Sequence, residues 1–338
     1  MNFDFTEDQQ TIKRTAHELL AARFKPERLR ELAESGLDDT EAFAELVELG
    51  WPGIAVSEAH GGQGLGLVEL VILQEELGYA LAPLPFLSSV AAALVLEHAG
   101  SDEQRERWLT PLLGGGGRGT LGLARDGHAP LVPDASGADF VILVDEVSGE
   151  GRIYHGEDID VQPLQTIDLT RRFAAATAGA GGDPLSGDVA GGVARAAVAL
   201  AAESVGIAQR MMEEAVAYAK DRRQFGQPIG VHQAVSHRCA QMFLETESAR
   251  SAAYYAAWTG DFEPDSLALA AASAKAYASD AGARVTASAL QVHGGIGFTW
   301  EHDLHFFLKR GRANASMYGD ARWHREQVAK KVLVPAAG

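Results

Sequence analysis

The sequence contains a single cysteine, Cys239, among 338 residues. One cysteine cannot form an intrachain disulfide, and it excludes a zinc site built from several thiolates. Positive charge is also scarce, because 46 acidic residues outnumber 29 basic ones and give a formal net charge of −17. A chain this acidic is poorly suited to neutralising the phosphates of nucleic acid or the headgroups of anionic lipids. We therefore expect neither nucleic acid nor a membrane among its partners.

Long uncharged apolar runs are missing as well. Residues 1–5 are acidic and lack the apolar core of a signal peptide. We identify no charge-free apolar stretch of about eighteen residues, the length that a membrane span requires. These absences predict a soluble, cytoplasmic protein. Alanine is abundant instead, and apolar residues make up 46% of the chain, which suits close packing between helices.

The chain divides into three regions with different residue patterns. Residues 1–113 and 188–338 place apolar residues at helical spacing, whereas residues 114–187 carry short β-type runs separated by Gly, Pro and Asp. The last region holds four long amphipathic stretches in series, typical of an up-and-down bundle, and the fourth is interrupted near residues 314–320. We predict an α+β fold with an N-terminal helical domain, a small central β domain and a C-terminal four-helix domain.

Local signals place several boundaries within these regions. Capping boxes at Thr6–Gln9 and Ser101–Gln104 each predict the start of a helix. The run Leu70–Leu77 predicts a helix that stops at Gly78. In the middle region, strands are predicted at three segments: Leu121–Ala124, Phe140–Val144 and Arg152–Tyr154.

Two runs carry most of the chemical information. The first reads Arg-Arg-Gln-Phe-Gly from Arg222 to Gly226, at a predicted helix end, and Gln233 follows it. Guanidinium groups fork onto phosphate oxygens, so this run can hold a diphosphate. The alternative is a positive helix C-terminus that offsets its own dipole.

The second run, from Gln291 to Phe298, reads Gln-Val-His-Gly-Gly-Ile-Gly-Phe. Three glycines within four positions remove the Cβ atoms where another group must approach the backbone. The run follows a helix rather than a strand, which argues against a Rossmann dinucleotide site. The alternative is a turn that ends the helix.

In this order and about seventy residues apart, the two runs resemble the flavin-binding signatures of the acyl-CoA dehydrogenase family. Segments 49–54, 58–65 and 75–78 resemble the first domain of that family. The resemblance spans nearly the whole chain. It implies the family fold with a central β-barrel domain, FAD as cofactor and an acyl-CoA substrate. It also implies the following flavin contacts: Arg222, Gln224, Phe225, Gln233, Gln291, Gly294 and Gly295. Within this set, Arg222 and Gln233 would hold the diphosphate, and Gly294 and Gly295 would admit the adenosine.

A catalytic glutamate is missing from its usual places. In the family, a Glu removes the α-proton of the thioester while the flavin accepts the β-hydride. The two positions that carry this Glu correspond here to Tyr318 and Ala196. Tyrosine is a poor base near pH 7, because its reference pKa is about 10. Asp320 and Glu203 are the candidates for a displaced base, and an exposed or charge-paired surface role is the alternative for both.

The residues that this chain lacks are those that the resemblance assigns to the other subunit of a shared FAD site. In this family two subunits share one FAD, and this chain keeps the pyrophosphate and adenine contacts. It lacks both the Glu and the flavin-contacting stretch of the β domain, where residues 123–130 read differently. Its short length and the Thr166–Arg172 run resemble the small chains of α2β2 actinobacterial acyl-CoA dehydrogenases. Those enzymes act in sterol side-chain breakdown.

We therefore predict FAD-dependent α,β-dehydrogenation of an acyl-CoA, in fatty acid or sterol side-chain β-oxidation. The expected partners are a longer acyl-CoA dehydrogenase subunit and an electron-transfer flavoprotein or similar acceptor. Two alternatives stay open: a structural partner that binds no flavin, and a non-redox acyl-CoA lyase or hydratase on the same fold. No metal site is predicted, because His302 and His305 lie three residues apart but have no apparent third ligand.

Overall fold

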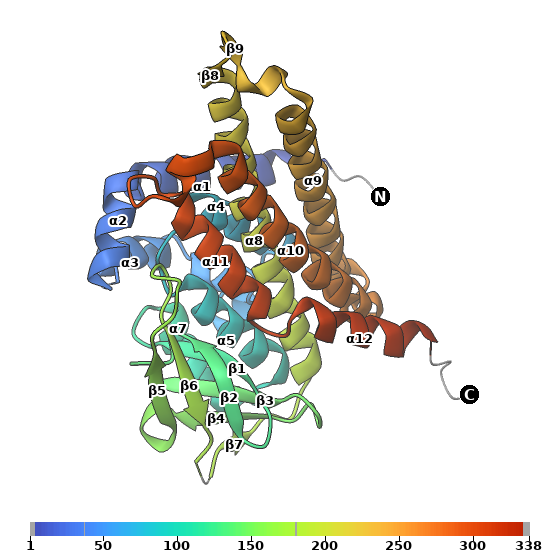
Figure 1. The fold of residues 1–338 in the computed structure, drawn as a ribbon. Coiled ribbons are helices and arrows are strands. Elements are labelled where there is room, and N and C mark those ends of the chain that lie inside the picture. Colours follow the sequence, from blue (N-terminus) through green and yellow to red (C-terminus); the bar gives the residue numbers. More distant parts are fainter. Residues whose placement is uncertain (1–3, 37, 180, 334–338) are drawn as a thin grey trace.

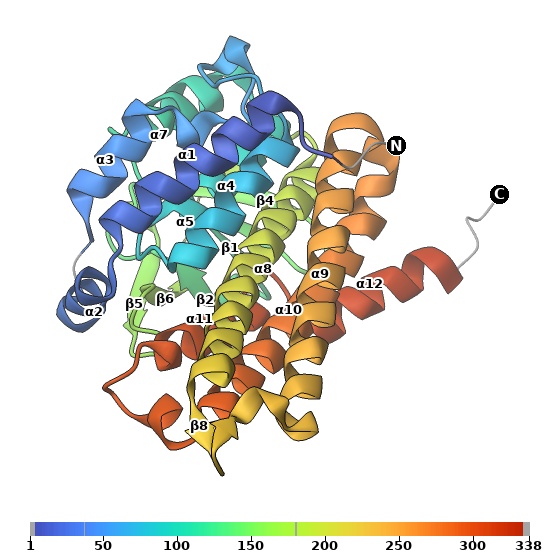
Figure 2. The same ribbon diagram turned by 90° about the horizontal axis from the view of Figure 1, so that it is seen from above.

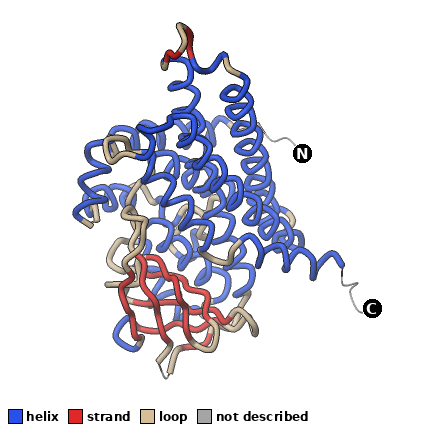
Figure 3. The backbone as a smooth tube through the Cα atoms, viewed as in Figure 1, coloured by secondary structure: helices blue, strands red, loops and turns tan. Residues whose placement is uncertain are grey.

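The computed structural model describes residues 4–36, 38–179 and 181–333. Helices form most of the molecule, and seven of the strands gather in one domain at one end (Figures 1 and 3). A small β-hairpin lies at the opposite end, at the tip of two long helices. The predicted order of helical, β and helical regions is confirmed.

The N-terminal region consists of helices, two of which begin at the predicted capping boxes. Its helices are α1 (Glu7–Arg23), α2 (Pro26–Ser35), α3 (Thr40–Glu48), α4 (Leu67–Ala80), α5 (Phe86–Ala99), α6 (Asp102–Gln104) and α7 (Thr110–Leu113). Short 3-10 turns lie at Trp51–Gly53 and Glu58–His60, and a π-helical turn at Arg105–Leu109 joins α6 to α7. Both capping boxes are present, with Gln9 N–H donating to Thr6 Oγ1 and Gln104 N–H donating to Ser101 Oγ, each over 3.2 Å.

Gly78 does not end its helix, so that prediction was wrong. Helix α4 runs through Gly78 to Ala80, and Leu81 adopts the left-handed conformation at its end. A Cβ at Gly78 would lie 2.1 Å from the carbonyl oxygen of Glu203 on the neighbouring helix α8. Gly206 on α8 makes the reciprocal approach, since its Cβ would lie 1.9 Å from the carbonyl oxygen of Glu75. These glycines therefore serve close packing between α4 and α8.

The central β domain contains two sheets. Its strands are β1 (Gly119–Ala124), β2 (His128–Pro133), β3 (Phe140–Asp145), β4 (Gly151–His155), β5 (Asp160–Leu164), β6 (Phe173–Thr177) and β7 (Asp183–Pro184). One sheet has the order β1-β3-β4-β7, and the other has the order β2-β6-β5. Strands β1 and β3 run parallel, and the remaining pairs in these sheets are antiparallel. The three predicted strands correspond to β1, β3 and β4.

The C-terminal region is a helical bundle built on α8. Its helices are α8 (Val189–Asp221), α9 (Gln233–Phe262), α10 (Pro264–His293), α11 (Leu304–Ser316) and α12 (Ala321–Leu333). The predicted interruption is confirmed between α11 and α12. Figure 2 shows α8 between α4 on one side and α9 with α10 on the other.

By length and composition, helix α8 is apolar enough to cross a membrane, although it is not charge-free, because Arg195 and Glu203 lie within it. Within the fold, 72% of its most apolar window is buried. Its sequence is apolar on nearly all sides because it packs against α4, α5, α9 and α10. Helix α8 is therefore the core helix of this protein.

Candidate functional site

The first signature run forms an exposed projection at one end of the bundle (Figure 1). Arg222 is the C-cap of α8, and the short strands β8 (Arg223–Gln224) and β9 (Gln227–Pro228) form a hairpin directly after it. Phe225 lies at the turn of this hairpin with φ of +51° and is 92% exposed. Ile229 N–H donates to the Arg222 carbonyl over 2.8 Å and closes the base of the hairpin. Gln233 is the first residue of α9.

The second signature run lies at the end of α10. Gln291 is exposed in the last turn, and Gly294 leaves the helix with φ of +64° to begin the 3-10 turn Gly294–Phe298. A Cβ at Gly294 or Gly295 would meet no atom within 4 Å among the described residues. The two glycines therefore present bare backbone to the outside rather than to the protein's own core.

An aromatic contact joins the two runs. The Tyr218 ring on α8 stacks on the His293 ring on α10, with centroids 4.4 Å apart. These residues directly precede the hairpin and the Gly294–Phe298 turn. We call the seven predicted contact residues the signature surface: Arg222, Gln224, Phe225, Gln233, Gln291, Gly294 and Gly295. Among the described residues, no side-chain hydrogen bond or ion pair is found for its arginine or glutamines, so their polar groups face outward unengaged.

In a second region, between the β domain and the bundle, the polar side chains are buried and paired with one another. Here Glu203 of α8 receives Arg171 Nη2 at 2.7 Å on one oxygen and Arg310 Nη1 at 3.0 Å on the other. Arg310 Nε also donates to Asp168 at 2.9 Å, and Asn314 accepts from Arg171 at 3.0 Å. All five side chains are buried. We call this set the interdomain charge cluster: Asp168, Arg171, Glu203, Arg310 and Asn314.

Glu203 is a structural ion-pair partner in this geometry. Burial opposes its charge, but Arg171 and Arg310 outweigh that effect and lower the pKa of Glu203 to about 2. A carboxylate held this strongly in its charged form is a weak proton acceptor. The alternative of an exposed or charge-paired surface role holds for the charge pairing only, because Glu203 is 3% exposed and lies in the interior.

The two positions that would carry the family's glutamate are packed in the core. Ala196 is fully buried on α8. Tyr318 lies in the turn between α11 and α12 with φ of +50° and is 4% exposed. Its hydroxyl has no hydrogen-bond partner among the described residues, and burial raises its pKa well above the usual range. Asp320 is exposed and caps α12, because its Oδ1 accepts from Trp323 N–H over 2.7 Å.

Asp134 is a further, half-buried carboxylate in this region. It follows β2 with φ of +50°, and Ser88 Oγ donates to its Oδ2 over 2.7 Å. Burial is the largest influence on Asp134 and raises its pKa. The cavity beside Asp134 and Arg171 measures about 20 Å³, room for roughly one water molecule. Sequence reasoning assigned no role to Asp134, Arg171 or Arg310. Of these three, only Arg171 lies in the Thr166–Arg172 run that carried part of the resemblance.

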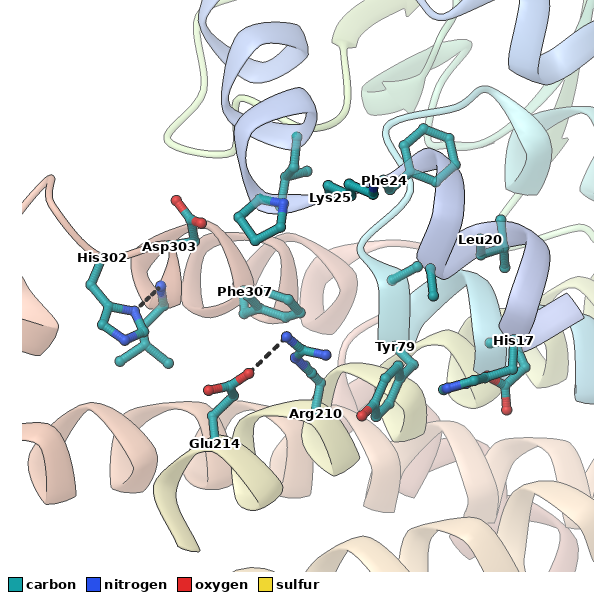
Figure 4. A pocket seen from close by; sticks show the side chains of 16 residues that line it. His17, Leu20, Phe24, Lys25, Tyr79, Arg210, Glu214, His302, Asp303 and Phe307 are labelled. Atoms are coloured by element: carbon teal, nitrogen blue, oxygen red, sulfur yellow. Dashed lines mark hydrogen bonds and ion pairs between the residues drawn. The ribbon is translucent and has the colours of Figure 1, made fainter. Parts of the chain in front are cut away.

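His302 of the Glu301–His305 segment lines another cavity. This cavity measures about 320 Å³ and lies between α1, α4, α8 and residues 302–307 (Figure 4). Arg210 and Glu214 form an ion pair of 2.7 Å in its wall, and His302 Nδ1 accepts from Leu304 N–H over 3.4 Å. The described residues contain no group of three or more His, Cys, Asp or Glu side chains that could hold a metal ion.

Comparisons with known proteins agree with the family that the sequence resembles. Residues 6–116 match the family model "Acyl-CoA dehydrogenase, N-terminal domain", and residues 189–333 match "Acyl-CoA dehydrogenase, C-terminal domain". The acyl-CoA dehydrogenase IpdE2 of Mycolicibacterium smegmatis is 35% identical over 330 residues, covering 97% of this chain and 100% of that protein. IpdE2 of Mycobacterium tuberculosis is 33% identical, covering 94% of each.

Solved structures show the same fold. The ChsE4-ChsE5 complex from Mycobacterium tuberculosis contains a chain with a TM-score of 0.90 and 24% identity, covering 99% of this chain and 100% of that one. Butyryl-CoA dehydrogenase from Megasphaera elsdenii gives a TM-score of 0.87 at 23% identity, covering 99% and 100%. The chain belongs to the acyl-CoA dehydrogenase family of FAD-dependent oxidoreductases.

Proposed function

We propose that this chain supplies one side of a FAD site and that a longer acyl-CoA dehydrogenase subunit supplies the other side with the catalytic base. The observation that carries the proposal is the contrast within one chain. The signature surface is exposed and its polar groups are unengaged, whereas the interdomain charge cluster is buried and mutually paired. Together the two subunits dehydrogenate an acyl-CoA between its α and β carbons.

The signature surface fits FAD through the type and placement of its groups. Arg222 offers a guanidinium that pairs with diphosphate oxygens, and Gln233 at the start of α9 adds an amide donor. Gly294 and Gly295 leave space for the adenosine against bare backbone. Gln224, Phe225 and Gln291 complete the contact surface. When bound, FAD supplies the hydride acceptor of the reaction.

The relatives support a paired assembly. One similar structure is a complex of two proteins, ChsE4 and ChsE5, and another, Tcur3481-Tcur3483, is a steroid acyl-CoA dehydrogenase. We propose an α2β2 assembly of the same kind in the cytoplasm, acting on a steroid-derived or fatty acyl-CoA. An electron-transfer flavoprotein or a similar acceptor would reoxidise the flavin.

The test is purification of the chain alone and together with a longer acyl-CoA dehydrogenase chain encoded beside it. We expect flavin absorbance near 450 nm and dye-coupled turnover on acyl-CoA from the co-purified pair, and neither from the chain alone. A folded chain that holds FAD and dehydrogenates acyl-CoA by itself would contradict the proposal.

A structural partner without any flavin contact is the second candidate. It is favoured by the lack of a free carboxylate at Tyr318 and Ala196, where the family's base would lie. Arg222→Ala separates the two functions, because a purely structural partner would support unchanged FAD binding by the pair.

A further inference from the structure

We propose that Tyr218, His293 and His302 are positioning residues. They fix the position of the hairpin after α8 relative to the Gly294–Phe298 turn, and so hold the two parts of the signature surface together. The inference rests on the proposed function, because it explains how this chain would present its FAD contacts. The three rings form a continuous row, with His293 stacked on Tyr218 at 4.4 Å and meeting the edge of His302 at 5.2 Å.

Each ring belongs to a different segment that the surface requires. Tyr218 lies in the last turn of α8, His293 ends α10, and His302 follows the Gly294–Phe298 turn. The two signature runs are far apart in the sequence and have separate helices as supports. Their relative position therefore depends on contacts between the helix ends, and the Tyr218–His293 stack is such a contact.

Tyr218 is linked to Arg222 through the backbone. The Tyr218 carbonyl accepts from Arg222 N–H over 2.8 Å, and the Arg222 carbonyl in turn accepts from Ile229 N–H over 2.8 Å. A shift of Tyr218 would thus move the base of the hairpin that carries the arginine. The half-buried Tyr218 ring has a stacking role and makes no side-chain hydrogen bond among the described residues.

His293 is fixed at the other end of the row. Its Nδ1 lies 2.8 Å from the Ala289 carbonyl, and since a carbonyl only accepts, this nitrogen carries the proton. A Cβ at Gly297 would approach His293 Cβ at 3.2 Å, so the Gly294–Phe298 turn folds back over this residue. His293 is 4% exposed, and burial is the largest influence lowering its pKa, which keeps the ring neutral and able to stack.

The test uses the assembled pair with a longer acyl-CoA dehydrogenase chain. Tyr218→Leu and His293→Leu remove one ring each, whereas Tyr218→Phe keeps the stack. We expect the two leucine variants to bind FAD about tenfold more weakly, because small displacements of positioned groups cost affinity. Saturating FAD should restore their kcat, and Tyr218→Phe should bind FAD as the wild type does.

A matched control is His17→Leu on α1. The His17 ring also contacts a tyrosine, Tyr79, at 5.3 Å and bonds Glu76 through Nδ1 at 2.8 Å, but it belongs to α1, outside both signature runs. His17→Leu should leave FAD affinity unchanged. Equal FAD affinity of wild type, Tyr218→Leu and His293→Leu would overturn the inference, and so would a kcat loss that added FAD does not restore.

A second measurement tests the positioning role independently of the proposed FAD site. Hydrogen exchange on the chain alone should become faster over residues 222–229 in Tyr218→Leu, with exchange in the middle of α8 unchanged. If the wild-type pair binds no FAD, the proposed function fails, and the positioning role is then judged by exchange alone. Unchanged exchange over residues 222–229 would overturn it.

Discussion

The signature surface and the interdomain charge cluster use similar side chains in opposite ways. At the end of the bundle, Arg222 and three glutamines face outward without intramolecular partners among the described residues. Between the β domain and the bundle, Arg171 and Arg310 are buried against Glu203 and Asp168. This scaffold can therefore keep outward-facing polar groups, the proposed flavin contacts, while charged side chains fill its own interior.

The energetic consequences of the two arrangements differ. Removing one member of a buried ion pair leaves the other charge without compensation, so the folded state loses stability. Removing an exposed arginine that contacts nothing in its own chain leaves folding nearly unaffected. The following predictions test this separation of stability from binding, from the largest expected effect to the smallest.

Glu203→Ala should lower the free energy of unfolding by about 3–5 kcal/mol, because Arg171 and Arg310 would remain buried without a carboxylate between them. Urea denaturation followed by circular dichroism measures the change. The control is Glu326→Ala, which breaks the exposed Arg322–Glu326 pair of 3.3 Å. It should change stability by less than about 1 kcal/mol. A loss below that value for Glu203→Ala would remove the distinction between the two regions.

Arg222→Ala should weaken FAD binding by the assembled pair by about 10- to 100-fold, the cost of roughly 1.5–3 kcal/mol for a charge-assisted hydrogen bond. The unfolding free energy should stay that of the wild type, because the exposed side chain makes no hydrogen bond or ion pair with the described residues. Fluorescence titration with FAD gives the affinity. Arg322→Ala, another exposed arginine, should not alter it.

The buried side chain of Lys275 predicts that the free energy of unfolding depends on pH. Lys275 contacts the turn that carries Tyr318. Its buried ammonium donates to the carbonyls of Asn314 and Gly319 at 3.1 Å each, and burial lowers its pKa to about 7. Between pH 7 and the unfolded value of about 10.4, the unfolded chain binds more protons, so stability rises with pH. We expect wild type to gain about 2 kcal/mol relative to Lys275→Met between pH 7 and pH 9. The same stability difference between wild type and Lys275→Met at pH 7 and at pH 9, measured by denaturation, would refute this prediction.

Asp320→Ala should cost about 1 kcal/mol of stability, since it removes the N-cap of α12. If Asp320 were a displaced base, its replacement would abolish turnover of the assembled pair. We expect turnover to be retained, and Asp320→Asn, which also caps, to restore the stability. Loss of turnover in both variants at full FAD occupancy would instead place the base in this chain.

Local patterns in the sequence were sufficient for some features. The capping boxes depend on residues three apart, and the helix-rich and β-rich regions follow from periodicity, so both were predicted correctly. Features made by distant residues were not. Arg310 and Asp168 are 142 residues apart, and each alone resembles an ordinary surface charge. Gly78 was misassigned for the same reason, because the backbone it admits belongs to α8.

For the candidate site, the flavin contacts stay a prediction, and only the placement of its residues in the fold is known. The two runs were recognised from their own residues, and they lie at one end of the bundle joined by the Tyr218–His293 stack. Strands β2 and β5 were not predicted because each contains proline, and β6 was not predicted because three of its five residues are alanine, which has low β propensity. The environment of Glu203 could not be predicted either, since its two guanidinium partners come from a loop of the β domain and from α11.

Helix α8 also limits which insertions and deletions this sequence can accept in evolution. It is one uninterrupted rod of 33 residues, about 50 Å long, with Glu203 near its middle and Arg222 at its end. Deleting one residue between them would rotate Arg222 relative to Glu203 by about 100° about the helix axis. Inserting seven residues would nearly keep their relative orientation but would lengthen the helix by about 10 Å. Substitution is therefore the tolerated route of divergence along this segment, and its length should be fixed among chains that share both regions.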